Sequence, residues 1–388
     1  MGYGELMIRS YDAQTDRPQV EDLERRCAVA PSKRALLFTD TMGDPICRIR
    51  NSPLYNMLVA ELDNELVGVI QGSIKLVTIR KLFKDLTKVG YILGLRVTPI
   101  HRRKGIGLRL AQKLEEWFIA NDVCYAYMAT EKDNEASVKL FINKLSYVKF
   151  RTPAILVNPV NKPMYHMSSK IDIVKLKIEE AESTYRKFMA STDLFPNDIN
   201  NILRNKLSLG TWVAYQRGET WCDFGSGNGG VPNNWAMVSV WNSGELFKLK
   251  LEKAPLTCLI CTKISRFIDS FFSCFKVPSI PDFLSPFGFY FIYGVHLEGP
   301  LSGQLVRTLC QFVHNMATMS KDCKIVVTEV GGSDSLRVHI PHWKTLSCPE
   351  DLWCIKALKN EDNNLLYECI KSSPTTNTRA LFVDPREV

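Results

Sequence analysis

A short cationic run followed by two glycines is the part of this 388-residue sequence best suited to chemistry: Arg102, Arg103, Lys104, Gly105 and Gly107. Binding a pyrophosphate requires several hydrogen-bond donors that converge on a few oxygens, and a helix N-terminus supplies backbone N–H groups and a favourable dipole. Glycine leaves out the side chain that would block this approach. The run therefore predicts a phosphate-binding loop, in which each charge-assisted hydrogen bond contributes roughly 1.5–3 kcal/mol.

The charge around this loop is one-sided. Residues 86–114 contain no Asp or Glu but seven Lys and Arg. This segment alone therefore has a charge of +7, compared with +8 for the whole chain. Acid-free basic runs also bind nucleic acid, yet aromatic side chains that could stack on bases are scarce in this one. The two glycines and the helix that follows favour a phosphate cradle, so we expect no direct nucleic-acid binding.

The periodicity of the sequence places the loop between a strand and a helix. Apolar residues alternate over 91–97, as in a strand that Pro99 ends, and they recur at spacings of three and four over 107–121, as in a helix packed on a sheet. The other elements expected in the first half are strands at 5–10, 56–61, 66–76, 123–129 and 147–157 and helices at 16–27 and 134–143. Their order is β-α-β-β-β-α-β-α-β.

The second half repeats part of this pattern. Two strand-like segments resemble each other: residues 91–97 and 290–297. Each precedes a helix that begins at a glycine, Gly107 or Gly303, and the strands after those helices both end in Thr-Glu. Because residues 277–306 contain no Lys or Arg, we interpret the second half as a degenerate copy that lacks the phosphate loop, which predicts one cofactor per chain.

Length and composition indicate two globular domains, since domains typically run to roughly 100–200 residues. Hydrophobic residues make up 45% and charged residues 23%, which is a globular composition. Two prolines, Pro159 and Pro163, interrupt the periodic pattern between the halves. We therefore expect a first domain at 1–158, a linker at 159–170 and a second domain at 171–388.

Secretion, membrane spanning and metal binding are not expected. No apolar leader begins the sequence, so we interpret its twelve cysteines as reduced thiols of a protein that is not secreted. The most apolar stretch, 283–297, is interrupted by proline and glycine and is shorter than the roughly 18–20 residues of a spanning helix. Cys258 and Cys261 have no second pair at zinc spacing, and they lie within 255–286, which fits a buried amphipathic helix.

The loop and its flanks resemble the Gcn5-related N-acetyltransferase superfamily. Its hallmark is Arg or Gln, two residues, Gly, one residue, then Gly or Ala, and residues 102–107 fit it between a strand and a long helix. Residues 134–141 resemble the second motif of the superfamily, and this resemblance covers roughly 5–157. The run 94–107 and the unusual second half also resemble the plant Hookless-type N-acetyltransferases, over nearly the whole chain.

This resemblance implies an α/β (α+β) fold of tandem acetyltransferase-type domains, each a mixed central sheet flanked by helices, with the second copy degenerate. It implies acetyl-coenzyme A as co-substrate, no metal, and direct attack by an amine without a covalent enzyme intermediate. The acceptor would be an amine, a histone or other protein lysine among the candidates. The protein would be located in the nucleus or the cytoplasm. It would have a role in the hormone responses of seedlings.

The residues expected to contact the cofactor combine the loop with the strand before it and one residue of the second motif: Leu95, Arg96, Val97, Arg102, Arg103, Lys104, Gly105, Ile106, Gly107, Leu108 and Asn134. By resemblance, the backbone of 95–97 would align the pantetheine arm and polarise the thioester, and Asn134 would bond that arm. Strands 91–97 and 123–129 would have to separate around it.

The acid and base are less clear from the sequence. The acceptor amine must lose a proton, and the leaving thiolate must gain one. Glu131 and His101 are candidates for the base, because strand 91–97 carries no carboxylate. Relatives often have Tyr where this chain has Phe141, so Tyr147 or water would supply the acid. Two alternatives stay open, namely a cofactor-binding adaptor with little catalysis and a scaffold whose second half binds a protein.

Overall fold

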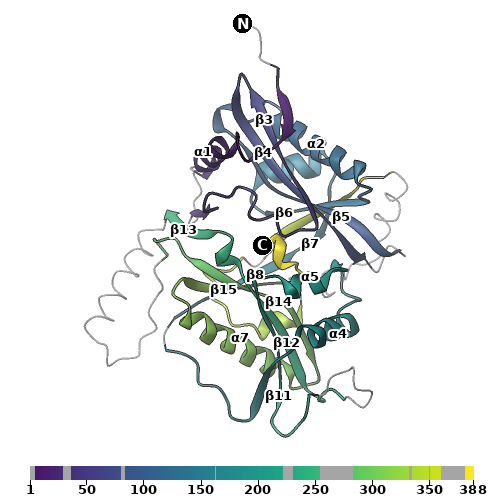
Figure 1. Ribbon diagram of the computed structural model, residues 1–388, viewed down its shortest axis with the longest axis vertical. Helices are drawn as coiled ribbons and strands as arrows, with labels where there is room; N and C mark the ends of the chain where they lie inside the picture. The colour runs from purple at the N-terminus through teal and green to yellow at the C-terminus, as the bar shows by residue number, and fades with distance from the viewer. Residues whose placement is uncertain are drawn as a thin grey trace, which may run out of the picture.

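Two mixed β-sheets face each other in the computed structural model, with the first half of the chain forming most of one and the second half most of the other (Figure 1). The structure describes residues 5–28, 36–79, 84–161, 163–221, 230–253, 283–331, 334–348, 350–359 and 381–388. The amphipathic helix expected at 255–286 and the pair Cys258 and Cys261 lie almost wholly outside these ranges. The expected α/β class of tandem, acetyltransferase-type sheets with flanking helices is confirmed.

The first sheet has the strand order β1-β3-β4-β5-β6-β16-β7. Its strands are β1 (Met7–Ser10), β3 (Leu54–Leu62), β4 (Glu65–Ile79), β5 (Lys84–Val97), β6 (Tyr125–Glu131), β7 (Val148–Arg151) and β16 (Asp351–Ala357), and the short β10 (Phe195–Pro196) pairs with β4. A hairpin joins β3 to β4, with Asp63 and Asn64 both at positive φ, which their short polar side chains tolerate.

The second sheet has the order β8-β15-β14-β12-β11-β9. Its strands are β8 (Pro153–Pro159), β9 (Ile171–Lys175), β11 (Ser208–Gln216), β12 (Trp235–Asn242), β14 (Gly288–Glu298) and β15 (Cys323–Gly331). A separate two-stranded sheet joins β2 (Leu36–Asp40) to β13 (Lys248–Lys253). Both large sheets therefore contain one parallel pair, β5–β6 and β14–β15, within otherwise antiparallel pairing.

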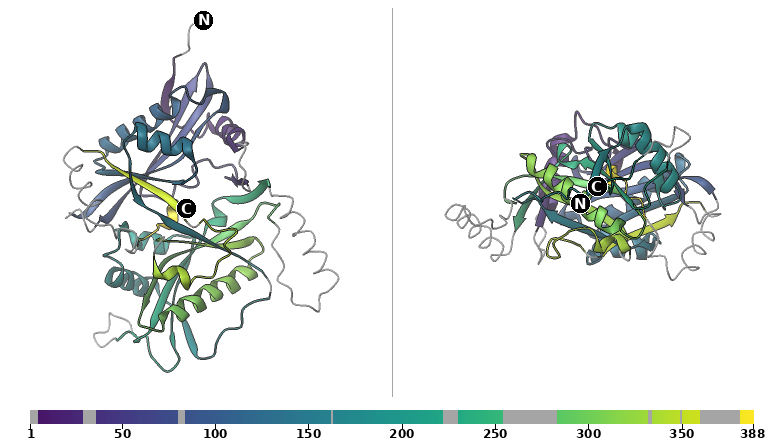
Figure 2. Two further views of the ribbon diagram at one scale, coloured as in Figure 1. Left: turned by 180° about the vertical axis from the view of Figure 1, so that it is seen from behind. Right: turned by 90° about the horizontal axis from the view of Figure 1, so that it is seen from below.

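Helices cover both faces of each sheet (Figure 2). The crossover helices α2 (Ile106–Ala120) and α7 (Ser302–Met319) connect the two parallel pairs and cover the outer faces, each over its own apolar core. The helices α1 (Arg17–Ala28), α4 (Ile178–Phe188) and α5 (Ile199–Arg204) pack on the facing sides. The segment expected as one helix at 134–143 is α3 (Glu135–Val138) followed by the π-helical turn η3 (Lys139–Lys144).

The two halves exchange strands, which the sequence-based boundaries at 1–158 and 171–388 miss. The segment 147–157, expected as one strand, is two: β7 stays in the first sheet, and β8 pairs with β15 in the second. In return β16, from near the end of the chain, enters the first sheet between β6 and β7. Pro153 begins β8, where a missing N–H donor interrupts the ladder.

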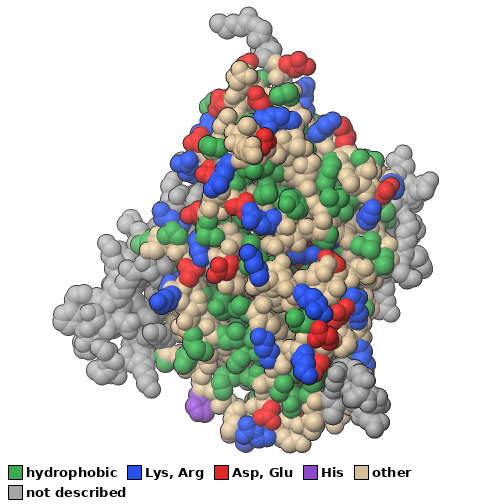
Figure 3. Space-filling model, in the orientation of Figure 1, with side chains coloured by type: hydrophobic (Ala, Val, Ile, Leu, Met, Phe, Trp, Pro, Cys, Tyr) green, Lys and Arg blue, Asp and Glu red, His purple; other side chains and the backbone are tan. Residues whose placement is uncertain are grey.

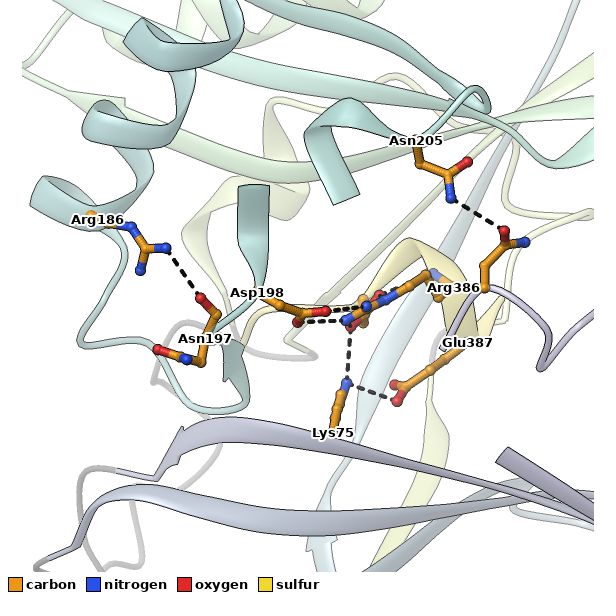
Figure 4. Close-up of polar contacts among 9 residues, drawn as sticks. Lys75, Arg186, Asn197, Asp198, Asn205, Arg386 and Glu387 are labelled. Atoms are coloured by element: carbon orange, nitrogen blue, oxygen red, sulfur yellow. Dashed lines mark hydrogen bonds and ion pairs between the residues drawn. The ribbon is translucent and has the colours of Figure 1, made fainter. Parts of the chain in front are cut away.

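A buried ionic network joins the sheets at their centre (Figure 4). Lys75 of β4 lies 2.7 Å from Glu387 and 3.4 Å from Asp384, and Arg386 lies 2.7 Å from both Asp384 and Asp198 at the start of α5. Burial by itself would raise the pKa of Asp384, but the charges of Arg386 and Lys75 hold it well below its usual range. The segment 381–388 therefore connects the two halves through charge as well as through apolar packing.

Candidate functional site

The strands β5 and β6 separate at their carboxyl ends. Their parallel register runs from Val89–Tyr125 to Ile92–Met128 and stops there, while β5 continues to Val97 beside β4 and β6 continues to Glu131 beside β16. A bulge in β5 at Gly94, where φ is +63°, turns the strand at this point. Backbone groups on the β6 side of β5 therefore lose their ladder partners and are available to a ligand, as the resemblance implies for the pantetheine arm.

The phosphate loop leaves the end of β5 through the short helix η2 (Pro99–His101) and leads into α2. Arg102 Nε donates to the Val97 carbonyl oxygen at 3.2 Å, so the loop is held to the end of the strand. Lys104 Nζ lies 3.4 Å from His101 Nδ1. The side chains of residues 102–104 are exposed, as an anion-binding loop requires.

The N-terminus of α2 has the space that a phosphate group would need. Gly105 precedes the helix at φ +85°, and no side chain caps the first turn. A Cβ built on Gly105 would meet nothing within 4 Å, whereas one on Gly107 would lie 3.7 Å from Leu140 and Val97. Free N–H groups, open space and exposed cations together fit the diphosphate of acetyl-coenzyme A.

Several residues expected to contact the cofactor have side chains that pack against other parts of the protein. The Ile106 side chain is buried in the core under α2, and the partly buried Leu108 packs against the same core, so their backbones alone could contact a ligand. Arg96 Nε donates to Glu24 of α1 at 3.1 Å. The Leu95 side chain lies beside Gly107, 3.8 Å from the position of a Cβ there.

The second motif borders the start of α2. Asn134 Oδ1 accepts a hydrogen bond from Ser137 N at 3.3 Å and so caps α3, with the residue exposed. Leu140 of η3 is the neighbour of Gly107 described above. Leu140 therefore lies beside the end of β5 and the start of α2, while the contact expected between Asn134 and the pantetheine arm stays a prediction.

Tyr147 lies in the core beneath α2. Its side chain is 1% exposed and contacts Phe141 edge-to-face at 5.2 Å between ring centroids. Burial, together with the nearby charge of Glu115, raises the pKa of Tyr147 well above its usual value. Glu115 itself pairs with Lys356 at 2.7 Å, more than two helical turns from the start of α2. This placement does not suit a proton donor to a thiolate at the end of β5.

Glu131 is the last residue of β6, on the segment that diverges from β5, and it is exposed. It shares its sheet face with Tyr127, because alternate residues of a strand point to the same side. That face looks toward the second sheet, where the central core contains side chains of both sheets. His101 instead lies on the phosphate loop beside Lys104. Of the two expected bases, Glu131 alone is on the diverging strand.

Two further carboxylates, missed from the sequence, face the same space. Asp351 of β16 is directly opposite Glu131 in the antiparallel register and is 7% exposed. Glu329 of β15 extends from the opposite sheet, on the face that contributes Val327 to the central core. We call Glu131, Asp351 and Glu329 the carboxylate cluster. The matching Thr-Glu strand ends were the sequence signal for Glu329, because they paired it with Glu131.

Burial makes two members of the cluster hard to ionise, the buried Asp351 and the partly buried Glu329. Loss of solvent, together with the charge of Asp351, raises the pKa of Glu329 to about 8. Loss of solvent also raises the pKa of Asp351 to about 6, with a contribution from the charge of Glu131. Buried carboxyl groups that influence one another in this way are typical of sites that move protons.

The surface in Figure 3 intersperses Lys and Arg with Asp and Glu side chains instead of gathering the cations into one basic area. Among the described residues, no group of three or more His, Cys, Asp or Glu side chains is placed to hold a metal ion. Every described helix is too short or too polar to cross a membrane.

Comparison with known proteins agrees with this geometry. The model of the acetyltransferase (GNAT) family matches residues 17–147. The chain is 45% identical to the Arabidopsis thaliana "Probable N-acetyltransferase HLS1", over 98% of this chain and 99% of that one. It is 33% identical to the Oryza sativa subsp. japonica "Acetyl transferase GW6a", over 98% of this chain and 97% of that one.

A solved structure shares the fold over most of the chain. Saccharomyces cerevisiae N-myristoyltransferase, solved with bound myristoyl-CoA, aligns with a TM-score of 0.55 and 10% identity, covering 91% of this chain and 79% of that one. The two proteins thus share a fold, and a sequence identity of 10% supports no conclusion beyond the fold. With an acetyltransferase motif at the diverging strands and relatives matched over 97–99% of their length, this chain belongs to the GNAT family of N-acetyltransferases, which use acetyl-coenzyme A to acetylate an amine.

Proposed function

We propose that the acceptor is a lysine side chain of another protein, with histones among the substrates, and that its amine attacks the thioester directly. One observation carries this proposal: the end of β5 that diverges from β6 lies between an open helix N-terminus and a face with three carboxylates. A lysine is long enough to reach such a partly buried place and carries the charge that carboxylates attract.

When bound, acetyl-coenzyme A supplies an acetyl group activated as a thioester. The exposed cations Arg102, Arg103 and Lys104 and the first N–H groups of α2 would hold its diphosphate. Backbone N–H groups at the end of β5, free of pairing with β6, would polarise the thioester carbonyl. Because Tyr147 is buried elsewhere, water supplies the proton that the departing thiolate takes up.

Calorimetry and turnover test the proposal together. Purified protein is titrated with acetyl-coenzyme A and then incubated with it and recombinant core histones, and acetylated lysines are identified by mass spectrometry. We expect one binding site per chain and acetyl transfer to lysine. Binding without transfer to any lysine would favour the adaptor instead, and folded protein that fails to bind at millimolar ligand would remove both.

We also propose that the reaction occurs in the plant nucleus and affects the hormone responses of seedlings. The resemblance to plant Hookless-type N-acetyltransferases supports this proposal. A fluorescent fusion expressed in seedlings should accumulate in nuclei. Exclusion of a functional fusion from nuclei, at an expression level that restores a mutant seedling, would contradict it.

A further inference from the structure

A row of aromatic rings lines the face of the first sheet that looks toward the second. Tyr91, Tyr127 and Trp353 come from the adjacent strands β5, β6 and β16, with ring centroids 4.9 Å and 5.7 Å apart. Aromatic faces attract ammonium groups, most strongly where water is excluded. One ammonium of the chain already uses this surface, since Lys75 Nζ lies 5.7 Å from the Tyr127 centroid and 2.7 Å from Glu387.

Two carboxylates of the cluster have no cation of their own. Among the described residues, neither Glu329 nor Asp351 forms an ion pair, whereas the acids beside Lys75 do. A buried carboxylate without a partner is expensive, and its charge is normally paired or lost. A cation that arrives from outside the described chain would remove this cost.

An unsatisfied carboxylate oxygen indicates where that cation belongs. Glu329 Oε1 is inaccessible to solvent and has no hydrogen-bond partner in the structure. The indole of Trp353, which is 3% exposed, lies beside both carboxyl groups, and its N–H partly offsets the rise in the pKa of Glu329 and Asp351 that burial causes. Buried polar atoms are nearly always satisfied, so an acceptor oxygen left open beside this ring indicates a missing donor, which an ammonium group would supply.

We infer that the carboxylate cluster, together with Trp353 and the Tyr91–Tyr127 wall, binds the protonated primary amine of the acceptor, with Glu329 taking its proton. This inference rests on the proposed function. Both halves thereby form the acceptor site, beside a cofactor held by the first half. The second half contributes Glu329, Asp351 and Trp353. Glu131 and Asp351 lie where β6 diverges from β5, so the bound amine would be next to the end of β5.

The step balances without any other reactant. The ammonium gives one proton to the Glu329 carboxylate, and the freed nitrogen lone pair attacks the thioester carbonyl. The C–N bond forms and the C–S bond breaks, with its electron pair leaving on the thiolate. The second proton of the nitrogen passes to solvent as the amide forms, and the thiolate takes one proton from water.

Two matched probes test the charge requirement directly. One is Nα-acetyl-lysine methylamide, and the other replaces its ammonium with a hydroxyl at the same chain length. Binding of each to the full chain is measured by ligand-observed NMR in the presence of coenzyme A. We expect the lysine probe to bind about 10-fold more tightly or better. Equal affinity of the two probes would overturn the inference.

Isosteric variants locate the site. We expect Glu329→Gln and Asp351→Asn to abolish the preference for the lysine probe, and Glu329→Gln to lower kcat/KM for its acetylation by about 100-fold or more. The control is Glu350→Gln, whose exposed carboxylate pairs with Lys132 at 2.8 Å and which should leave both values unchanged.

Acetyl-coenzyme A binding separates this inference from the proposed function. Its dissociation constant, measured by calorimetry, should stay within about twofold in all three variants, because none of them touches the phosphate loop. Loss of binding in the parent protein would overturn the proposed function. Normal binding and unchanged acceptor kinetics in both cluster variants would overturn the acceptor site alone.

Discussion

The two parallel strand pairs of this protein have the same construction but different surroundings. Pairing stops after Ile92–Met128 in β5–β6 and after Ile292–Thr328 in β14–β15. In both, the first strand bulges at a glycine with positive φ, +63° at Gly94 and +59° at Gly294. Although the two halves resemble each other only weakly in sequence, both keep this interruption of strand pairing beside a glycine bulge. We call each interruption a break.

What lies beside the break differs. Next to Gly294 stands Tyr185 of α4, fully buried, so close that a Cβ at this glycine would collide with its ring and hydroxyl. The Tyr185 hydroxyl is 2.7 Å from Ser239 Oγ and is therefore satisfied within the protein. The first break has an open, cationic helix start next to it instead. The same interruption of strand pairing borders the proposed cofactor site in one copy and is filled by core in the other, where α4 packs over it.

The largest effect is expected from breaking the network that holds the two sheets together. Arg386→Met leaves Asp384 and Asp198 without their guanidinium, so the free energy of unfolding should fall by about 3–5 kcal/mol, measured by urea denaturation. Arg217→Met is the control, because its exposed pair with Asp172 contributes about 0–1 kcal/mol. Equal losses in the two variants would mean that the network does not hold the halves together.

The asymmetry in cofactor binding is tested at the start of α2. Gly107→Glu places a negative charge at the anion site and should weaken acetyl-coenzyme A binding by about 100-fold or more, about 2.7 kcal/mol, in calorimetry. Gly107→Ala should keep the fold, since its Cβ makes only ordinary contacts. Leu301→Glu, at the start of α7, should leave the affinity unchanged. A loss caused by Leu301→Glu would contradict the single-site assignment.

The burial of Glu329 predicts a change of stability with pH. Because its pKa is raised to about 8 in the folded protein, its contribution to stability is fully present below the unfolded pKa and is lost as the pH rises through 8. Glu329→Gln does not ionise, so it should gain about 2 kcal/mol relative to the parent between pH 5 and pH 6.5, where the carboxyl group ionises in the unfolded chain but not in the folded protein. Denaturation at both pH values measures this gain, and a difference that does not change with pH would place Glu329 in solvent.

The smallest effect is expected from the residue that closes the second break. Tyr185→Phe removes one buried hydrogen bond and should cost about 1 kcal/mol of unfolding free energy. Ser239 keeps a second partner in Thr211, 2.6 Å away. Acetyl-coenzyme A affinity and stoichiometry should not change, because the ring still fills the break. A second binding site in this variant would show that the hydroxyl alone excludes the ligand.

Much of the first half was predictable because its signals are local. The strand at 91–97, its end at Pro99 and the helix behind Gly105 follow from spacing within about 30 residues, and the structure confirms them as β5, η2 and α2. The turn at Asp63 and Asn64 depends on equally local backbone preferences. The burial of Tyr147 could not be predicted in this way, because the sequence shows that a tyrosine is near a motif and not which side of the sheet its hydroxyl faces.

The sequence by itself determined the chemistry of the phosphate loop and the existence of a second, altered copy. These depend on residue type, short spacing and backbone preferences, which act along the chain. Only the tertiary structure decided that β8 joins the second sheet, that β16 joins the first, and that Glu329 and Asp351 come to face Glu131. Strand partners and facing side chains are set by burial between elements as many as 200 residues apart, and no local pattern records that pairing.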